Sequence, residues 1–479
     1  MGRLSRRQIL VLALCPVAIA AGATAGVLSS HSGSGPTVNV SADGPNGGAA
    51  DPAGAEAGIM PGDQSTPEPA DPSTTATGPG STTSTTAQPT TTTQPTAGTD
   101  ATTPTGPSTT TTTTAPTTTT TTVPPAQPSV TFRAPVEVPA GTDAVAVAAG
   151  DFNGDHHPDL AVVDNGPAHQ VVILTGDGKG SFAAGAAYPA PGPTAITTGD
   201  FNGDGRPDLA VLNAGSSSIS ILMGVGDGTF TPKPAIATGV EPLGILTADF
   251  TGDHVADLAV VTRNQTISVY PGAGAGAGDG TFSPAISTSV PGPTQAFAAR
   301  DLNGDGKVDI AVGGDDTVYT LLGTGNGRFQ TPVPHQASGS IQAVGIGDVN
   351  HDGRPDVVAV VPDLSAAYSF LGTPTGLGPA SYQSIAGATP PGSGSSAALA
   401  VGDITGDHTD DVVISVATNK NVVLLLDNGT ATLGHPLPNL TTGSGPLGLT
   451  LADVNGDGRA DLVVADSSGG VAVFLAQGS

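Results

Sequence analysis

The chain has 479 residues and a formal net charge of −27 at pH 7, because 41 acidic residues oppose only 14 Lys and Arg. This charge argues against nucleic acids and anionic membrane surfaces as partners. The only cysteine, Cys15, excludes an intrachain disulfide, and 69 Gly with 43 Pro indicate that much of the chain cannot form a packed core.

Residues 1–29 have the order of an export signal, in which basic residues precede an apolar run and small residues follow it. The sequence SRRQIL from Ser5 resembles a twin-arginine motif, and an ordinary Sec signal is the alternative. The apolar run can be extended to Leu28, so a cleaved signal and a retained signal anchor both stay open. Leu14 stands where a lipoprotein signal has a small residue, which argues against lipidation of Cys15.

Residues 30–127 are predicted to be a disordered linker. Thr109–Thr114 and Thr117–Thr122 are pure threonine, and prolines interrupt the whole segment. A segment without apolar periodicity cannot bury a core, and its Ser/Thr/Pro composition is typical of a stalk that carries O-linked sugar. At about 3.1 Å per residue, an extended stalk of this length reaches up to about 300 Å.

Residues 128–479 contain one acidic nonapeptide seven times, and we call the copies loops 1 to 7. They read DFNGDHHPD, DFNGDGRPD, DFTGDHVAD, DLNGDGKVD, DVNHDGRPD, DITGDHTDD and DVNGDGRAD, and they begin at Asp151, Asp200, Asp249, Asp301, Asp348, Asp403 and Asp453. Consecutive loops start 47 to 55 residues apart. Positions 1, 5 and 9 are always Asp, so these loops hold about half of all the acidic residues. Such clustering indicates cation sites rather than a generally solvated surface.

The spacing of these oxygen-bearing side chains suits calcium, which takes six to eight oxygen ligands. Side chains at positions 1, 3, 5 and 9, with a backbone carbonyl near position 7, can surround one ion, and Gly at positions 4 and 6 permits the tight backbone that this requires. A metal-free Asp/Asn/Gly turn is the alternative for any single loop. Loops 3 and 6 have Thr at position 3 and are expected to be the weakest sites. The predicted ligands of up to seven Ca²⁺ ions are Asp151, Asn153, Asp155, Asp159, Asp200, Asn202, Asp204, Asp208, Asp249, Thr251, Asp253, Asp257, Asp301, Asn303, Asp305, Asp309, Asp348, Asn350, Asp352, Asp356, Asp403, Thr405, Asp407, Asp411, Asp453, Asn455, Asp457 and Asp461.

Short apolar segments between the loops predict four strands in each repeat of about 50 residues, which is typical of one propeller blade. Residues 144–149 enter loop 1, DLAVV leaves it from Asp159, QVVILTG follows, and a Gly-rich turn then begins a fourth strand, as in GDGTFTP from Gly226. The last repeat lacks its fourth strand. Residues 130–135 (VTFRAP) resemble the missing segment, so we expect this strand to complete blade 7 and close the ring.

Position 12 of every loop is apolar, at Val162, Val211, Val260, Val312, Ala359, Ile414 and Val464. An EF-hand needs a Glu there, together with flanking helices. The EF-hand interpretation is therefore excluded.

The loops and the GDGTF-type turns resemble FG-GAP/VCBS repeats, the units of the integrin α-subunit head and of many exported bacterial proteins. The resemblance covers about Val130 to Ser479. It implies an all-β, seven-bladed β-propeller with calcium in the first inter-strand loop of each blade, and a role in extracellular binding or adhesion. Residues 387–396 and 273–278 depart from the pattern, and the lack of an inserted domain argues against an integrin-type receptor.

We therefore expect a secreted or cell-surface, non-enzymatic binding protein, whose partner is an extracellular protein or a glycan and which contacts a membrane only through an N-terminal anchor. A secreted enzyme acting on polysaccharide and a structural cell-wall spacer are the alternatives. No H-E-x-x-H or G-x-S-x-G motif occurs, and five of the nine histidines lie in the loops. Asp315, Asp316 and Asp363 are the carboxylates left for catalysis outside the loops, and ordinary turns explain them better.

Overall fold

The computed structural model describes residues 129–273, 279–385, 397–417, 420–427, 433–434, 439–443 and 445–477. The predicted export signal, the predicted stalk, the 387–396 stretch and most of the 273–278 insert lie outside these residues. The described part of the chain contains no helix with the length and apolar character needed to cross a membrane.

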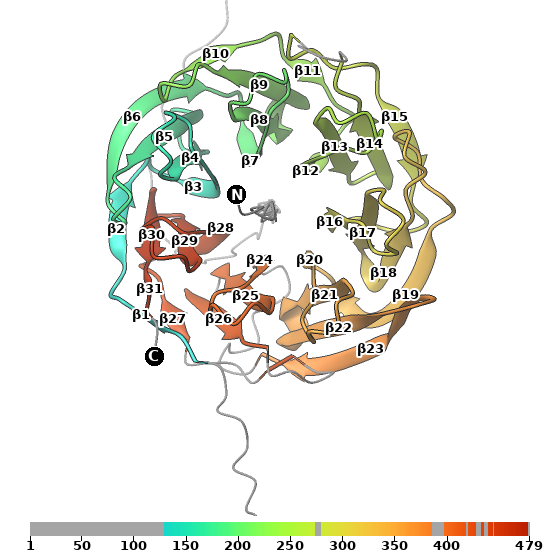
Figure 1. The fold of residues 1–479 in the computed structure, drawn as a ribbon. Helices are drawn as coiled ribbons and strands as arrows, with labels where there is room; N and C mark the ends of the chain where they lie inside the picture. Colours follow the sequence, from blue (N-terminus) through green and yellow to red (C-terminus); the bar gives the residue numbers. More distant parts are fainter. Residues whose placement is uncertain are drawn as a thin grey trace, which may run out of the picture. The chain divides into compact units, whose positions relative to one another are not determined.

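Seven antiparallel sheets are arranged around a ring (Figure 1). Each sheet has a first strand innermost and a fourth strand outermost. Blade 1 consists of β3 (Ala144–Gly150), β4 (Asp159–Asp164), β5 (Gln170–Gly176) and β6 (Phe182–Pro189). Blade 2 consists of β7 (Pro193–Gly199), β8 (Asp208–Asn213), β9 (Ser218–Gly224) and an outer strand divided into β10 (Phe230–Pro232) and β11 (Ile236–Ala237). Blade 3 consists of β12 (Pro242–Ala248), β13 (Asp257–Thr262), β14 (Thr266–Tyr270) and β15 (Ile286–Ser289).

The other four blades repeat this order. Blade 4 consists of β16 (Ala296–Arg300), β17 (Asp309–Gly313), β18 (Asp315–Leu321) and β19 (Val333–Ser340). Blade 5 consists of β20 (Ala343–Gly347), β21 (Asp356–Val361), β22 (Ala366–Thr373) and β23 (Gly376–Ser384). Blade 6 consists of β24 (Ala397–Gly402), β25 (Asp411–Val416), β26 (Asn421–Leu425) and β27 (Leu440–Thr441), and blade 7 of β28 (Pro446–Ala452), β29 (Asp461–Asp466), β30 (Gly470–Phe474) and β2 (Val136–Pro139).

The core lies between neighbouring blades. The innermost strands contact one another in sequence around the ring, and β28 contacts β3. All residues of the second strands are buried in every blade, as in the DLAVVD sequence of β4. A strand covered on both faces needs an unbroken apolar run, and this explains why these segments do not alternate between apolar and polar residues. The outer strands β6 and β19 alternate between partly buried and exposed residues, because one face meets water.

The outer position of blade 7 is taken by β2, which pairs with β30, rather than by the whole of the expected segment 130–135. Within that segment only β1 (Thr131–Phe132) is a strand, and it pairs with β31 (Ala476–Gln477), after the end of β30. The reason is that the outer segment of blade 7 is interrupted between β1 and β2. The outer strand of blade 2 is interrupted in a similar way, and its parts β10 and β11 pair with the two ends of β9. The resemblance to the fourth-strand segments thus located β1 but missed β2.

The predicted all-β fold and the seven four-stranded blades are confirmed. Two short 3₁₀ helices lie wholly within the described residues, η1 (Ala214–Ser216) and η2 (Pro362–Leu364). Both occupy turns between a second and a third strand, so neither contributes to the core layers.

Candidate metal centres

The seven acidic loops join the first and second strands of their blades, and position 9 of each loop is the first residue of the second strand. Since every blade has the same strand order around the ring, these loops and the turns between third and fourth strands lie on one face of the propeller. The turns between second and third strands lie on the other face. We call these the loop face and the opposite face.

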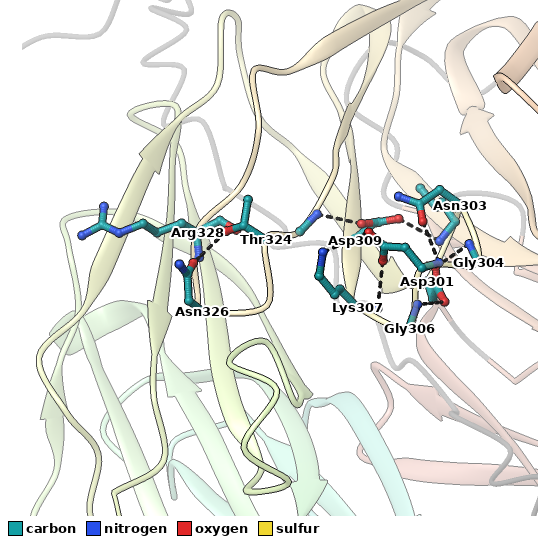
Figure 2. A network of polar contacts seen from close by, with 12 residues as sticks. Asp301, Asn303, Gly304, Gly306, Lys307, Asp309, Thr324, Asn326 and Arg328 are labelled. Carbon is teal, nitrogen blue, oxygen red and sulfur yellow. Dashed lines mark hydrogen bonds and ion pairs between the residues drawn. The ribbon is translucent and has the colours of Figure 1, made fainter.

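Loop 4 shows the local geometry (Figure 2). The Asp301 carboxylate accepts hydrogen bonds from three backbone N–H groups: those of Gly304 (2.7 Å) and Asp305 (3.2 Å) reach Oδ1, and that of Gly306 (2.8 Å) reaches Oδ2. The Asn303 carboxamide oxygen accepts from Asp305 N–H at 2.8 Å. These bonds wrap the backbone around the carboxylate of position 1. The loop conformation is therefore held by hydrogen bonds without a bound ion.

The same bonds recur around the ring. In all seven loops the N–H of position 6 donates to Oδ2 of the Asp at position 1, at 2.7–2.9 Å. In all seven the N–H of position 7 donates to the Asp at position 5, at 2.8–3.0 Å. The repeated sequence therefore gives a repeated conformation, with side-chain oxygens gathered inside each turn.

The Asp at position 9 is fully buried in every loop. Its two oxygens accept N–H groups from position 2 of the loop and from a residue at the end of the third strand or two residues beyond it, at 2.7–3.0 Å. In loop 4 these donors are Leu302 and Gly323. The carboxylate therefore ties the first, second and third strands of its blade together, in addition to any role as a ligand.

Burial raises the pKa of every position 9 carboxyl above its usual value. The pKa reaches about 6 for Asp208 and about 7 for Asp411. After burial, the charges of Asp204 and Asp200 raise the pKa of Asp208 further, while the N–H donors oppose the shift. Three carboxylates of one loop thus interact unfavourably, and this is a cost that a divalent cation would relieve.

Position 6 is His in loops 1, 3 and 6, at His156, His254 and His408, with φ of 68° to 70°. Their side chains are 90–96% exposed, and Nδ1 lies 3.6–3.7 Å from the Asp at position 1. The backbone is in the left-handed region that glycine adopts at position 6 elsewhere, as at Gly205. These imidazoles face solvent and leave the interior of the turns to oxygen atoms.

Loops 3 and 6, which we expected to be the weakest sites, differ in their bonding. The N–H groups of Thr251 and Thr405 donate to the Asp at position 9, at 2.9 and 3.2 Å. The Asn loops instead use the carboxamide oxygen as a further acceptor inside the turn, as in loop 4. The Thr loops therefore offer a different oxygen set, and their lower affinity stays a prediction.

No group of three His, Cys, Asp or Glu side chains in the described residues is close enough to form a ready-made metal cluster. The donor set nevertheless fits calcium in kind, because positions 1, 3, 5 and 9 supply only carboxylate, carboxamide or hydroxyl oxygens. The calcium ligands proposed from the sequence therefore have suitable chemistry and a common turn. Ion binding itself stays a prediction.

Sequence reasoning missed the role of position 2, whose side chain packs between blades. The Phe152 ring meets Phe230 of the next blade at 5.4 Å between centroids, Phe201 meets Phe282 at 5.4 Å, and Phe250 meets Phe329 at 6.2 Å. The partners are the Phe residues of the GDGTF-type turns. The signal was present, because position 2 is Phe, Leu, Val or Ile in every loop.

Sequence reasoning also missed a link between loops. The Asp410 carboxylate, at position 8 of loop 6, accepts the backbone N–H of Asp348 in loop 5 at 2.9 Å. It also lies 3.5 Å from the guanidinium of Arg300, directly before loop 4. Three neighbouring loops are thus connected through one carboxylate, which only the ring brings together.

Comparisons with known proteins agree with this architecture. The profile of the FG-GAP-like repeat matches residues 152–211, 200–260, 301–359 and 403–464. These stretches include all seven acidic loops apart from the first residue of loop 1. No curated protein matches the chain.

Solved structures share the fold. The crystal structures of BBS1N in complex with ARL6DN, soaked with lead and with mercury, each match 72% of this chain, with TM-scores of 0.51 and 0.52 and identities of 16% and 17%. They are matched over 98% and 96% of their own length. A lectin from Agrocybe aegerita that recognises non-reducing terminal N-acetylglucosamine matches 69% of this chain and 93% of its own, with 18% identity and a TM-score of 0.45. Taken with the seven loops and blades, the family match shows that this chain carries FG-GAP-like repeats within a seven-bladed β-propeller.

Proposed function

We propose that this protein is an exported, calcium-binding β-propeller that acts as a non-enzymatic binding or adhesion module at the cell surface or outside the cell. The observation that carries the proposal is the sevenfold recurrence of one hydrogen-bonded acidic turn on a single face. A turn that gathers carboxylates in water needs a counter-charge, and two carboxylates about 5 Å apart repel by roughly 3 kcal/mol at an effective dielectric constant near 20.

Calcium has a structural role in this proposal. The ions neutralise the carboxylates of positions 1, 5 and 9, and the position 9 carboxylate connects each turn to three strands of its blade. Calcium binding would then stabilise every blade, and the phenylalanine contacts of loops 1 to 3 would transmit this order to the next blade. The partner, an extracellular protein or a glycan, binds elsewhere on the propeller.

Export is supported by the sequence alone, through the signal-like order of residues 1–29 and the stalk-like composition of residues 30–127. A binding role is supported by the family and by the fold, since the BBS1N structures are complexes with ARL6DN. At 16–17% identity those structures indicate the fold of this chain and name no partner for it.

Two of the three carboxylates considered for catalysis outside the loops accept hydrogen bonds. Asp315 accepts a hydrogen bond from the Gln295 amide at 2.9 Å, and Asp316 accepts the backbone N–H of Gly339. Asp363 lies in the first turn of η2. Because no observation favours catalysis by these groups, we propose no enzymatic function.

The proposal is tested by thermal unfolding of the full chain in EDTA, Mg²⁺ and Ca²⁺, with bound calcium counted by equilibrium dialysis. We expect calcium to raise Tm well above the EDTA value, and magnesium to raise it much less, because its small octahedral shell fits a flexible turn with many oxygen ligands poorly. At a free calcium concentration of 100 times Kd, each filled site adds about 2.7 kcal/mol. Equal Tm values in EDTA and calcium would show that the turns are metal-free.

A further inference from the structure

A groove of about 580 Å³ lies at the boundary between blades 2 and 3. One wall is the outer edge of blade 2 at Ile236–Gly239, and the other consists of β14, β15 and the residues next to them. The volume is within the range of small-molecule sites in proteins.

The groove lies where a small side chain stands at the blade boundary. Ser268 of β14 pairs with position 12 of its loop, Val260. The residues that pair with position 12 in blades 4 and 5 are Tyr319 and Tyr368. The Tyr319 hydroxyl donates to the Pro291 carbonyl in the connection from blade 3, so that its side chain spans the boundary between blades 3 and 4. A serine leaves this space open.

Short outer strands widen the opening. β15 has four residues and β11 has two, whereas β6 and β19 have eight each. At the same boundary the Tyr270 hydroxyl donates to the Ala237 carbonyl at 3.3 Å, which joins the two walls. The groove is therefore a supported feature of the two blades.

The lining of the groove is uncharged. It contains no Asp, Glu, Lys, Arg or His, although the chain carries a net charge of −27. Its polar groups are the hydroxyls of Thr and Ser residues and the amide of Asn264, and its apolar surface includes the rings of Tyr270 and Phe282.

Two of the polar side chains are deeply buried. Thr262 is 1% exposed and Ser268 is 7% exposed. The Ser268 and Ser287 hydroxyls lie 3.0 Å apart. The Thr262 hydroxyl donates to the Asn264 carboxamide oxygen and also lies 3.1 Å from the Thr266 carbonyl oxygen. Each hydroxyl oxygen carries two lone pairs and can accept a further hydrogen bond. Neutral donors and acceptors beside aromatic carbon suit a ligand that is itself neutral and covered with hydroxyls.

We propose that this groove is a binding site for an uncharged carbohydrate. The inference rests on the proposed binding function and supplies its ligand class. Hydroxyl and amide groups of the groove hydrogen-bond the sugar hydroxyls, and the partly buried Phe282 ring packs against its C–H surface. Anionic sugars are disfavoured, because no basic side chain lines the groove.

The test titrates the full chain in calcium with maltotriose, cellotriose and triacetylchitotriose, and with trigalacturonate as the charged counterpart. Binding is followed by ligand-observed saturation-transfer NMR and by calorimetry. We expect at least one neutral trisaccharide to bind with a millimolar or lower Kd and trigalacturonate to give no signal. Two results would overturn the proposal. One is the absence of binding by all the neutral probes up to about 10 mM, a Kd at which the binding free energy falls below about 3 kcal/mol. The other is binding of trigalacturonate alone.

The blocking variant is Ser268→Tyr, because tyrosine occupies the corresponding position in blades 4 and 5. We expect it to abolish binding, whereas Asn264→Ala weakens binding about five- to tenfold by removing one hydrogen-bonding group. The matched control is Ser220→Tyr, the same change at the corresponding position of blade 2, which should leave Kd unchanged. If Ser268→Tyr retains binding, the site is not this groove.

Two further measurements distinguish the carbohydrate site from the calcium sites and from a peptide site. The Tm difference between calcium and EDTA is recorded on the same samples, so failure of the calcium proposal is distinguished from failure of the carbohydrate site. A synthetic peptide of residues 107–122 is titrated as a competitor. If this Thr/Pro peptide binds in the groove and no sugar does, the carbohydrate assignment is wrong.

Discussion

The buried Asp at position 9 has two separable roles, and loop 4 allows them to be measured. Asp309 is fully buried and accepts the N–H groups of Leu302 at 2.9 Å and Gly323 at 2.7 Å. Asp309→Ala leaves both donors buried without an acceptor. Each lost acceptor costs about 1–3 kcal/mol, so the free energy of unfolding in EDTA should fall by about 2–6 kcal/mol.

The matched variant is Asp305→Ala in the same loop, which removes a predicted ligand near the surface. In EDTA it should change stability little, because the carboxylate's partners are the Lys307 backbone N–H and the Lys307 ammonium group at 3.3 Å, and this ion pair is exposed to solvent. In calcium both variants should lose the contribution of one site, about 2.7 kcal/mol at 100 times Kd.

Urea unfolding of wild type and both variants, in EDTA and in calcium, measures the two effects. Equal stability of Asp309→Ala and Asp305→Ala in EDTA would contradict the connecting role of position 9. An unchanged calcium increment in both variants would contradict the ligand assignment of loop 4. The two results are independent, so either idea can fail without the other.

Three other changes have expected outcomes. In EDTA the domain should become more stable as pH falls from about 7 to about 5. Folded Asp411 has a pKa of about 7, so it holds its proton more tightly than in the unfolded chain and is destabilising when ionised. Asp411→Asn should reduce this gain in urea titrations. With calcium present the gain should shrink or reverse, since protons compete with the ion. Phe201→Ala should cost about 3–5 kcal/mol in urea unfolding by opening a cavity against Phe282, and a cost below about 1 kcal/mol would contradict the inter-blade role. Gly154→Ala should lower Tm measurably in EDTA and in calcium, because φ is 77°, a backbone conformation that residues with a Cβ rarely adopt; an unchanged Tm would show that the turn relaxes freely.

The sequence predicted the features that depend on short-range periodicity. The loops fix the starts of the second strands, and QVVILTG and SISILMG correspond to β5 and β9 residue for residue. This success follows from burial on both faces, which requires continuous apolar runs that are visible without any tertiary information.

The features that the sequence did not predict depend on pairs of distant residues. Asp159 was predicted as a ligand, but its bonds to Phe152 N–H and Gly176 N–H exist only because three strands lie side by side. Similarly, the break between β1 and β2 depends on where β30 ends. Periodicity reports which face a residue takes, and it does not report which partner it meets.

The groove between blades 2 and 3 is another feature that depends on distant residues and that periodicity does not predict. It also shows that the parts that stabilise the domain differ from the part proposed to recognise a ligand. A feature repeated seven times around a ring presents seven similar surfaces, so the acidic turns supply stability more readily than recognition of one ligand. The groove combines Ser268, a divided outer strand in blade 2 and a short outer strand in blade 3. Serine also stands at the corresponding position of blade 2, so the combination with the altered outer strands is what departs from the repeat. A serine at a boundary position that tyrosine fills in blades 4 and 5 would leave a destabilising cavity if the space were closed. Here the space opens to solvent and is lined with hydroxyls, so water or a hydroxylated ligand can occupy it. This boundary is therefore where a domain built from repeats can bind one ligand selectively.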